Sequence, residues 1–161
     1  MTLNDASNFL ESLKIDTYKK SEIKIFENFI EILTALKHRD LTEKELQSLE
    51  NKLDTLELKA KIKNRTKYYK RIIEEFKIYM KDELSLTVSG YYATLGLTLG
   101  MAFGPGLGMV LGMLFPNYFE RSMGIMLGLL AGIVIGQLVG NHLDTKAEMQ
   151  NRILNTNKKN S

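Results

Sequence analysis

Glycine is the residue that most constrains the fold of this chain, because ten of its twelve copies recur at every fourth position in two runs. A spacing of four places residues on one ridge of an α-helix. Glycine on that ridge removes the side chain, so another backbone can approach closely, and this pattern is typical of helices that pack inside a membrane. The first run is Gly96, Gly100, Gly104, Gly108 and Gly112, and the second is Gly124, Gly128, Gly132, Gly136 and Gly140.

The two runs share a register. If the chain folds back at Tyr118, they meet level by level, and the two residue numbers at every level add up to 236. We therefore expect a tight antiparallel hairpin with Gly104 opposite Gly132 near its middle. Each four-residue step turns a ridge by about 40° around the helix axis, which predicts close contact at the central levels only. Glycines towards the ends would then face neighbouring copies of the chain.

Long stretches without charge surround these glycines. No Asp, Glu, Lys or Arg occurs from Leu84 to Phe119 or from Met123 to Leu143. A helix of about 20 residues crosses the roughly 30 Å hydrocarbon layer of a bilayer, so we expect two spans, over about 92–115 and 123–143, with a turn between them. Aromatic side chains are expected to anchor both membrane interfaces. They are Tyr91 and Tyr92 at the start of the first span, and Tyr118 and Phe119 after its end.

Two polar or helix-breaking features lie inside the expected spans. Pro105 removes a backbone donor in the first span and predicts a kink there, either as part of the packing or as a gating hinge. Gln137 is the one strongly polar side chain deep in the second span. At the opposite level stands Thr98, so we expect an interhelical hydrogen bond between Gln137 and Thr98 or an adjacent chain.

The first 58 residues predict a helical head. Apolar residues recur at helical spacing over 5–13 and over 17–38,. Thr42 and Glu45 form a capping box at the start of a third helix, whose apolar seam is Leu46, Leu49, Leu53 and Leu56. Because such a small core is only marginally stable alone, oligomerisation or docking of a protein partner would stabilise it.

A basic segment follows the head. Its cations lie between residues 59 and 71 with no acidic residue among them. We interpret the segment as juxtamembrane and attracted to anionic lipid headgroups; nucleic acid is the less favoured partner, because the spacing spreads the charges around a helix. From Arg65 the apolar residues describe an amphipathic helix that leads towards the first span. The expected headgroup residues are Lys59, Lys61, Lys63, Arg65, Lys67, Lys70 and Arg71, and the apolar ones are Tyr69, Ile72, Ile73, Phe76 and Met80.

The predicted organisation is therefore all-α. It comprises a cytoplasmic head (1–58), a basic juxtamembrane helix (59–91), a transmembrane hairpin (92–143) and a cytoplasmic tail (144–161). Six Lys or Arg precede the first span within residues 64–83 and four follow the second, against Arg121 alone in the turn. By the positive-inside rule both termini face the cytoplasm. The N-terminus lacks the features of a cleaved signal peptide, and we expect an integral protein of the bacterial inner membrane.

The residues carry no enzymatic constellation. The chain has no cysteine, which excludes disulfides, thiol nucleophiles and thiolate metal sites. His38 and His142 lack metal-ligand spacing, and the glycines are not followed by the Gly-Lys-Ser/Thr ending of a phosphate-binding loop. We expect neither an enzyme nor a bound cofactor or metal.

The paired ladders from Gly96 to Gly112 and from Gly124 to Gly140 resemble those of glycine-zipper membrane proteins. More loosely, the helical head followed by Gly90, Tyr91 and Tyr92 is similar to bacterial two-span proteins of uncharacterised function. The resemblance implies tight helix packing and no particular activity. Two hypotheses follow: a self-associating membrane scaffold or small pore that forms a homo-oligomer in the lipid bilayer, or a membrane-anchored adaptor whose cytoplasmic head binds a protein partner.

Overall fold

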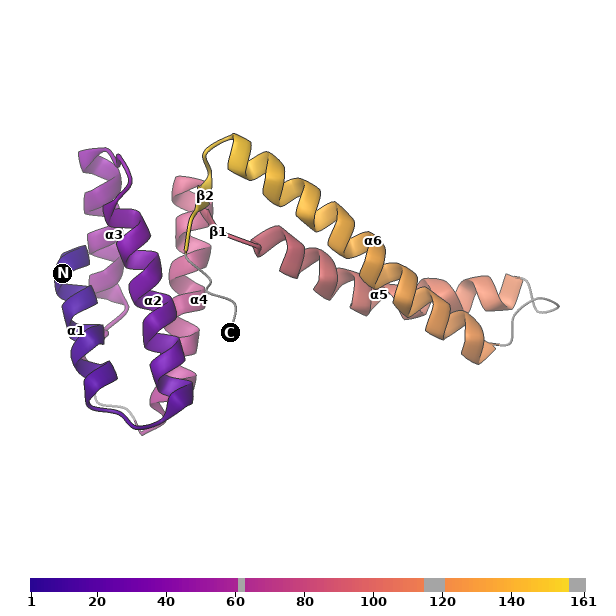
Figure 1. The fold of residues 1–161 in the computed structure, drawn as a ribbon, viewed down its shortest axis with the longest axis horizontal. Helices are drawn as coiled ribbons and strands as arrows, with labels where there is room; N and C mark the ends of the chain where they lie inside the picture. Colours follow the sequence, from indigo (N-terminus) through magenta and orange to yellow (C-terminus); the bar gives the residue numbers. More distant parts are fainter. Residues whose placement is uncertain (61–62, 115–120, 157–161) are drawn as a thin grey trace. The chain divides into compact units, whose positions relative to one another are not determined.

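The computed structural model describes residues 1–60, 63–114 and 121–156 (Figure 1). Within these ranges the chain is all-helical apart from two strands of two residues each, and its two longest helices are the apolar ones at the C-terminal end. The chain divides into two compact units. One, the head, comprises Met1–Val88 together with the segment from Leu154; the other, the hairpin, is Ser89–Ile153.

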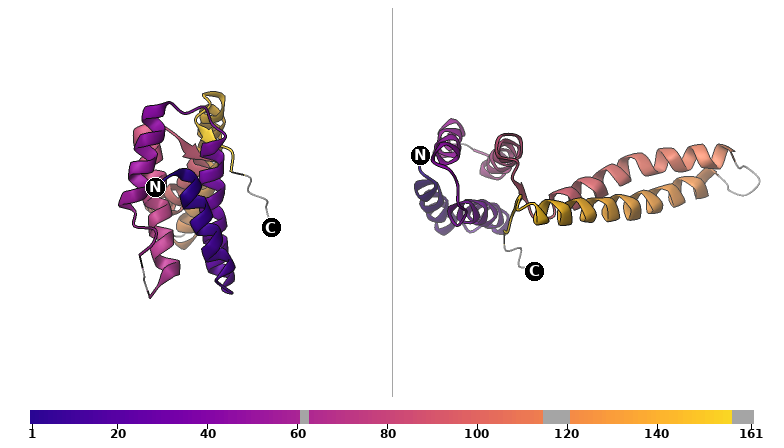
Figure 2. Two further views of the ribbon diagram at one scale, coloured as in Figure 1. Left: turned by 90° about the vertical axis from the view of Figure 1, so that its left-hand side faces the viewer. Right: turned by 90° about the horizontal axis from the view of Figure 1, so that it is seen from above.

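The head contains four helices, and Figure 2 shows it in two further views. They are α1 (Leu3–Ile15), α2 (Lys20–Lys37), α3 (Glu43–Thr55) and α4 (Arg65–Leu84). The helices predicted over 5–13 and 17–38 are confirmed as α1 and α2. Each of these four helices has an apolar face, and the four faces meet in one core.

Side-chain caps set the start of three head helices. The predicted capping box of α3 is present: Thr42 accepts a hydrogen bond from the Glu45 amide at 3.3 Å, and the Glu45 carboxylate accepts one from the Thr42 amide at 2.8 Å. The same box opens α1, between Thr2 and Asp5. Asn64 caps α4 through its side-chain oxygen. Each box satisfies backbone donors that the first turn of a helix leaves without partners.

The head core is built on aromatic rings from α2 and α4. Phe26 meets Tyr69 edge to face with ring centroids 5.0 Å apart, and Phe29 lies 5.5 Å from Phe76. Helix α3 adds Leu49 and Leu53, which are fully buried. Leu46 does not belong to this seam, because it is 37% exposed at the edge of the bundle.

Helix α4 is a full member of the head rather than a separate juxtamembrane helix. Its predicted apolar face, which includes Ile72, Phe76 and Met80, is buried in the head core, and the compact unit extends to Val88. The helix ends at Ser85, which adopts a left-handed backbone conformation (φ 55°). The boundary predicted at 58 therefore does not divide the structure, because the amphipathic face of α4 needs the head to cover it.

The C-terminal segment also belongs partly to the head. Strand β1 (Thr87–Val88) pairs with β2 (Ile153–Leu154) in a two-stranded sheet. Leu154 is only 2% exposed and lies in the same core cluster as Leu86. The predicted tail from 144 begins as the last turns of α6, and it then contributes the core side chain of Leu154. Residues 157–161 lie outside the described part.

The second unit is an antiparallel pair of long helices, α5 (Tyr91–Leu114) and α6 (Arg121–Met149). Both helices are long and apolar enough to cross a membrane. In the apolar 18-residue stretch of each helix, only 17% of the residues of α5 and 11% of those of α6 are buried. Helix α6 extends six residues beyond the span predicted to end at 143. Of the predicted turn between the spans, residues 116–120 with the anchors Tyr118 and Phe119 lie outside the described residues, and Arg121 and Ser122 already belong to α6.

Candidate functional site

The ladder glycines form the contact surface between α5 and α6. A methyl carbon placed on Gly104 would lie 2.5 Å from the Gly128 carbonyl oxygen and 3.3 Å from the Gly132 Cα. One placed on Gly128 would lie 2.6 Å from the Gly108 Cα. The distances of 2.5 and 2.6 Å are far below the normal contact distance of carbon, so backbone packs directly on backbone and only glycine fits.

The expected register is present in the backbone contacts. Gly104 faces the Cα of Gly132, and a methyl carbon added to Gly108 would lie 2.8 Å from the Cα of Gly128. Each of these glycines also meets the carbonyl of the glycine one turn away, as Gly104 meets Gly128. Every such glycine therefore sits between two glycines of the opposite helix, so the two ridges interdigitate.

The contact is not limited to the central levels, and that prediction was wrong. Gly96 meets Gly136 and Gly140 at one end of the ladders, and Gly124 meets Gly112 at the other. A four-residue repeat exceeds the 3.6 residues of a helical turn, so its ridge winds around the helix, and two helices can follow it only by coiling around each other. Figure 1 shows α5 and α6 crossing in projection. The end glycines consequently pack within the same chain.

The hairpin is closed at its open end by a carboxylate that the sequence analysis missed. Asp144 of α6 accepts hydrogen bonds from the amides of Tyr92 (3.1 Å) and Ala93 (2.9 Å). These amides belong to the first turn of α5, where donors lack partners inside the helix and a negative charge is stabilising. The first turn of α5 has no acidic residue of its own. The sequence could have indicated this contact, because the residue numbers of Tyr92 and Asp144 also add up to 236, as those of the paired glycines do.

The predicted bond between Gln137 and Thr98 is absent. The Thr98 hydroxyl donates to the Thr94 carbonyl at 2.8 Å on its own helix, and both Thr98 and Gln137 are exposed on the outside of the hairpin. The glycine ridges explain this, because they turn the helices so that bulkier residues point away from the contact. Contact of Gln137 with an adjacent chain, the other alternative, stays a prediction.

Pro105 lies inside α5, which continues through it to Leu114. Figure 1 shows this helix bent along its length, in keeping with the expected kink. Next to it, Gly106 points away from α6, because a methyl carbon added there would meet no atom within 4 Å. Gly106 is the outward counterpart of Gly104 and has no packing role within the hairpin.

The basic segment lies at the beginning of α4. The Arg65 guanidinium is 4.0 Å from the Asp16 carboxylate, and the Arg71 guanidinium lies 5.4 Å from the Tyr68 ring. Lys59 lies 6.0 Å from the Phe9 ring. The ammonium-bearing residues of the segment in the described part, Lys59, Lys63, Lys67 and Lys70, are exposed; Lys61 lies outside that part.

The segment is not next to the point where the chain continues into the hairpin. Helix α4 has 20 residues and rises 1.5 Å per residue, so its first turn is about 30 Å from its last. The chain leaves the head from the last turn, after Leu84. Contact of these cations with lipid headgroups stays a prediction.

Glu22 is a buried carboxylate of the head. It accepts hydrogen bonds from the hydroxyls of Thr17 (2.9 Å) and Thr66 (3.4 Å), and its carboxylate lies 3.5 Å from the Lys19 ammonium. Burial raises its pKa, but the bond from Thr17, the Lys19 charge and the bond from Thr66 outweigh burial, so the pKa of Glu22 lies below its ordinary value,. The residue ties the start of α2 to the start of α4.

The remaining chemistry of the described residues is sparse. No group of three or more His, Asp or Glu side chains among them could hold a metal ion, and His38 and His142 are both exposed. The head has open hollows on its surface, one of them about 760 Å³ and lined by Phe9, Leu53 and Leu58 together with polar residues. Neither the family models, nor the curated proteins, nor the solved structures compared with this chain match it.

Proposed function

We propose that this chain is a membrane-anchored binding module, in which the hairpin spans the bilayer and the helical head binds another protein at its surface. The observation that supports this proposal is that the two glycine ladders pack against each other along their whole length within one chain. Backbone contact runs from Gly96 to Gly112 on α5 and from Gly124 to Gly140 on α6. A hairpin that satisfies its own packing ridges needs no second copy to be a stable anchor.

The outer surface of the hairpin suits lipid. Large apolar side chains on both helices are about half or more exposed, among them Phe103, Leu107, Ile135 and Leu138. In water such a surface would be costly, since roughly 25 cal/mol per Å² of apolar area favours its burial, and soluble monomers rarely expose patches of this size. A bilayer removes that cost.

The proposed location is the bacterial inner membrane with both termini in the cytoplasm. The connectivity supports a common side for both ends, because the head is built from Met1–Val88 and from Leu154 onward, on either side of the hairpin in the sequence. The excess of Lys and Arg in the flanks over the single Arg121 between the helices favours the cytoplasmic side.

Self-association as a scaffold or small pore is the second candidate. It is favoured by four small residues at a four-residue spacing on the outward side of α5, together with exposed Gln137 on α6. Small residues let a second helix approach closely. No charged ring selects ions, because residues 92–115 and 123–143 include no charged residue. The small residues are Thr94, Thr98, Ala102 and Gly106, all exposed.

Three measurements on the full chain test the first proposal. Alkaline carbonate should leave the protein in the membrane fraction, its mass in mild detergent should be that of one chain, and liposomes that contain it should not leak. Gly106→Leu, which changes only the outward side of α5, should leave the mass unchanged. A defined oligomer that Gly106→Leu dissociates would favour the scaffold instead, and extraction by carbonate would overturn membrane insertion.

A further inference from the structure

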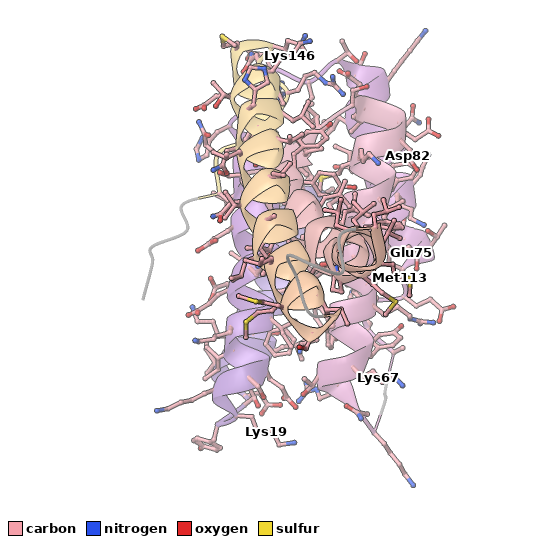
Figure 3. The ribbon with its side chains drawn as sticks, turned by 90° about the vertical axis from the view of Figure 1, so that its right-hand side faces the viewer. Lys19, Lys67, Glu75, Asp82, Met113 and Lys146 are labelled. Atoms are coloured by element: carbon pink, nitrogen blue, oxygen red, sulfur yellow. The ribbon has the colours of Figure 1, made fainter. Side chains whose placement is uncertain are left out.

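One end of the head brings together two segments that are far apart in the sequence. The connection between α1 and α2 meets the start of α4 there, because Asp16 faces Arg65 and Glu22 accepts a bond from Thr66. Figure 3 shows Lys19 and Lys67 towards this end of the head and Asp82 towards the other. We call this end the basic tip, defined by Ile15, Tyr18, Lys19, Lys20, Lys63, Arg65 and Lys67.

Among the described residues of the head, the two most accessible large apolar side chains lie at the basic tip. Tyr18 is 97% exposed and Ile15 is 83% exposed, against 58% for Ile78 and 37% for Leu46. Both stand at or beside the turn between two helices, so they project from the bundle instead of lying along a helix face. Both side chains can therefore enter an apolar environment outside the protein without any change in the fold.

Exposed cations lie at the same end of the head as these two side chains. Lys19, Lys20, Lys63 and Lys67 are exposed. Of the nearby carboxylates, Glu22 is buried in its hydrogen-bond network, and Asp16 is exposed and lies 4.0 Å from Arg65. The surface that a partner would meet thus combines exposed apolar side chains with exposed cations.

A hollow of about 440 Å³ opens beside the basic tip. Its apolar lining comes from Phe9, Leu13 and Tyr69, and its charged lining residues are Lys59, Lys63 and Arg65, with no carboxylate among them. A hollow lined by three cations and by apolar side chains fits a ligand with a negative head and an apolar body.

We propose that the basic tip docks on an anionic lipid surface, with Tyr18 and Ile15 inserted at the headgroup level. Tyrosine prefers that level because its ring is apolar and its hydroxyl is polar, and lysines around an inserted apolar residue are attracted to anionic lipid. Nucleic acid explains the cations but not exposed Ile15, since aromatic stacking and phosphate contacts use no aliphatic side chain.

This contact goes beyond the anchoring role of the hairpin, and it depends on the head alone. The tip lies about 30 Å along α4 from the end of the helix that leads to the hairpin. The head could therefore reach the membrane that holds the hairpin or a second one. Either surface satisfies the inference, and the experiment separates them.

Tyr18→Trp provides the probe, because the chain has no tryptophan. The full-length variant is placed in neutral phosphatidylcholine nanodiscs, and vesicles with or without phosphatidylglycerol are added. In a parallel sample the nanodisc itself contains phosphatidylglycerol. We expect a blue shift of the tryptophan emission, and quenching by brominated lipid, only where anionic lipid is present. A response to added vesicles indicates a second membrane, and a response within the nanodisc indicates the same one.

One control matches the tryptophan probe, and a second matches the lysine substitutions. Ile78→Trp places the same fluorophore on an exposed site of α4 outside the tip and should not respond. Lys20→Gln or Lys67→Gln in the Tyr18→Trp background should each weaken the response by about fivefold, because one basic residue near an anionic surface is worth about 1 kcal/mol, whereas Lys44→Gln should not.

Unchanged tryptophan emission from the Tyr18→Trp variant with anionic lipid in both formats would overturn the inference, as would an equal response to neutral lipid. Quenching of that emission by an oligonucleotide without any response to lipid would assign the tip to nucleic acid and also overturn it. These failures differ from failure of the anchor, which is read by carbonate extraction of the same protein.

Discussion

Asp144 is the residue whose effect on the hairpin is easiest to isolate. It stands 52 positions after Tyr92, yet its two carboxylate oxygens hold the amides of Tyr92 and Ala93 in the first turn of α5. Asp144→Ala should destabilise the hairpin by about 1 kcal/mol, the usual effect of losing a helix cap. Hydrogen exchange at the Tyr92 and Ala93 amides should accelerate.

Glu148 provides the control for that change. It lies one turn further along α6 and is exposed, so Glu148→Ala removes the same charge without removing a cap. Asp144→Asn keeps one acceptor oxygen and should fall between Asp144→Ala and the wild type. Unchanged exchange in Asp144→Ala would show that the cap does not hold this end of α5.

Glu22 makes the stability of the head depend on pH. Because its pKa is lower in the folded chain than its ordinary value of 4.5, the ionised form is stabilised by folding. That contribution is complete at neutral pH, and it is lost as the pH falls below 4.5 through the folded pKa. Glu22→Gln should lower the free energy of unfolding by about 2 kcal/mol at pH 7.

The difference between wild type and Glu22→Gln should shrink in acid. Urea unfolding of the head at pH 7 and pH 3, followed by tyrosine fluorescence in detergent, measures it. Asp5 and Glu45 also have lowered pKa values, caused first by hydrogen bonds from their capping threonines, so only the difference between the two proteins isolates Glu22. If the difference in the free energy of unfolding stays constant with pH, ionisation of Glu22 does not account for it.

At the scale of elements, the spacing of residues along the sequence predicted the features that local backbone geometry determines. The four-residue recurrence of glycine predicted the hairpin register, and Thr42 with Glu45 predicted the start of α3. The wrong expectations concern relations that spacing does not encode. Coiling of α5 around α6 extends the glycine contact to Gly96 and Gly112, and it leaves Gln137 on the outside, because a helix pair adjusts its crossing to its closest contacts.

The glycine contact can be tested with two substitutions on the same helix. Gly104→Ala puts a methyl carbon 2.5 Å from the Gly128 carbonyl oxygen, so α5 and α6 must separate, at a cost of about 1–3 kcal/mol. Gly106→Ala meets nothing within 4 Å and should be neutral or stabilising by up to about 1 kcal/mol, because alanine is the better helix former.

Titration with sodium dodecyl sulfate in mild detergent, followed by circular dichroism, measures both variants against the wild type. Equal stabilities for Gly104→Ala and Gly106→Ala would contradict direct backbone packing between α5 and α6.

At the scale of the whole molecule, the sequence could not show that the head is assembled from both sides of the hairpin. The apolar pattern of 65–84 predicted an amphipathic helix, but only packing shows which surface covers it. Leu154 stands in a polar tail, where one leucine carries no periodic signal. Leu154→Ala should destabilise the head by about 3 kcal/mol, as for other buried leucines, whereas exposed Asn155→Ala should have little effect.

Urea unfolding of the head measures this pair of variants. Because Leu154 is 2% exposed in the same core as Phe76, a C-terminal truncation after Gln150 should reproduce the loss in Leu154→Ala. Wild-type stability after that truncation would show that the segment from Leu154 is not part of the head.

The head's assembly from both sides also constrains how the protein can lie in a membrane. If α5 and α6 each cross once, residues before Ser89 and after Ile153 must lie on one side, and the connection between the helices on the other. The chain has no cysteine, so single cysteines report each position. With a membrane-impermeant maleimide on intact spheroplasts, we expect Ser122→Cys to react, and Ser12→Cys and Asn155→Cys to react only after permeabilisation. Reaction of Ser12→Cys without Asn155→Cys would rule out a two-span hairpin, and reaction of both with Ser122→Cys protected would reverse its orientation.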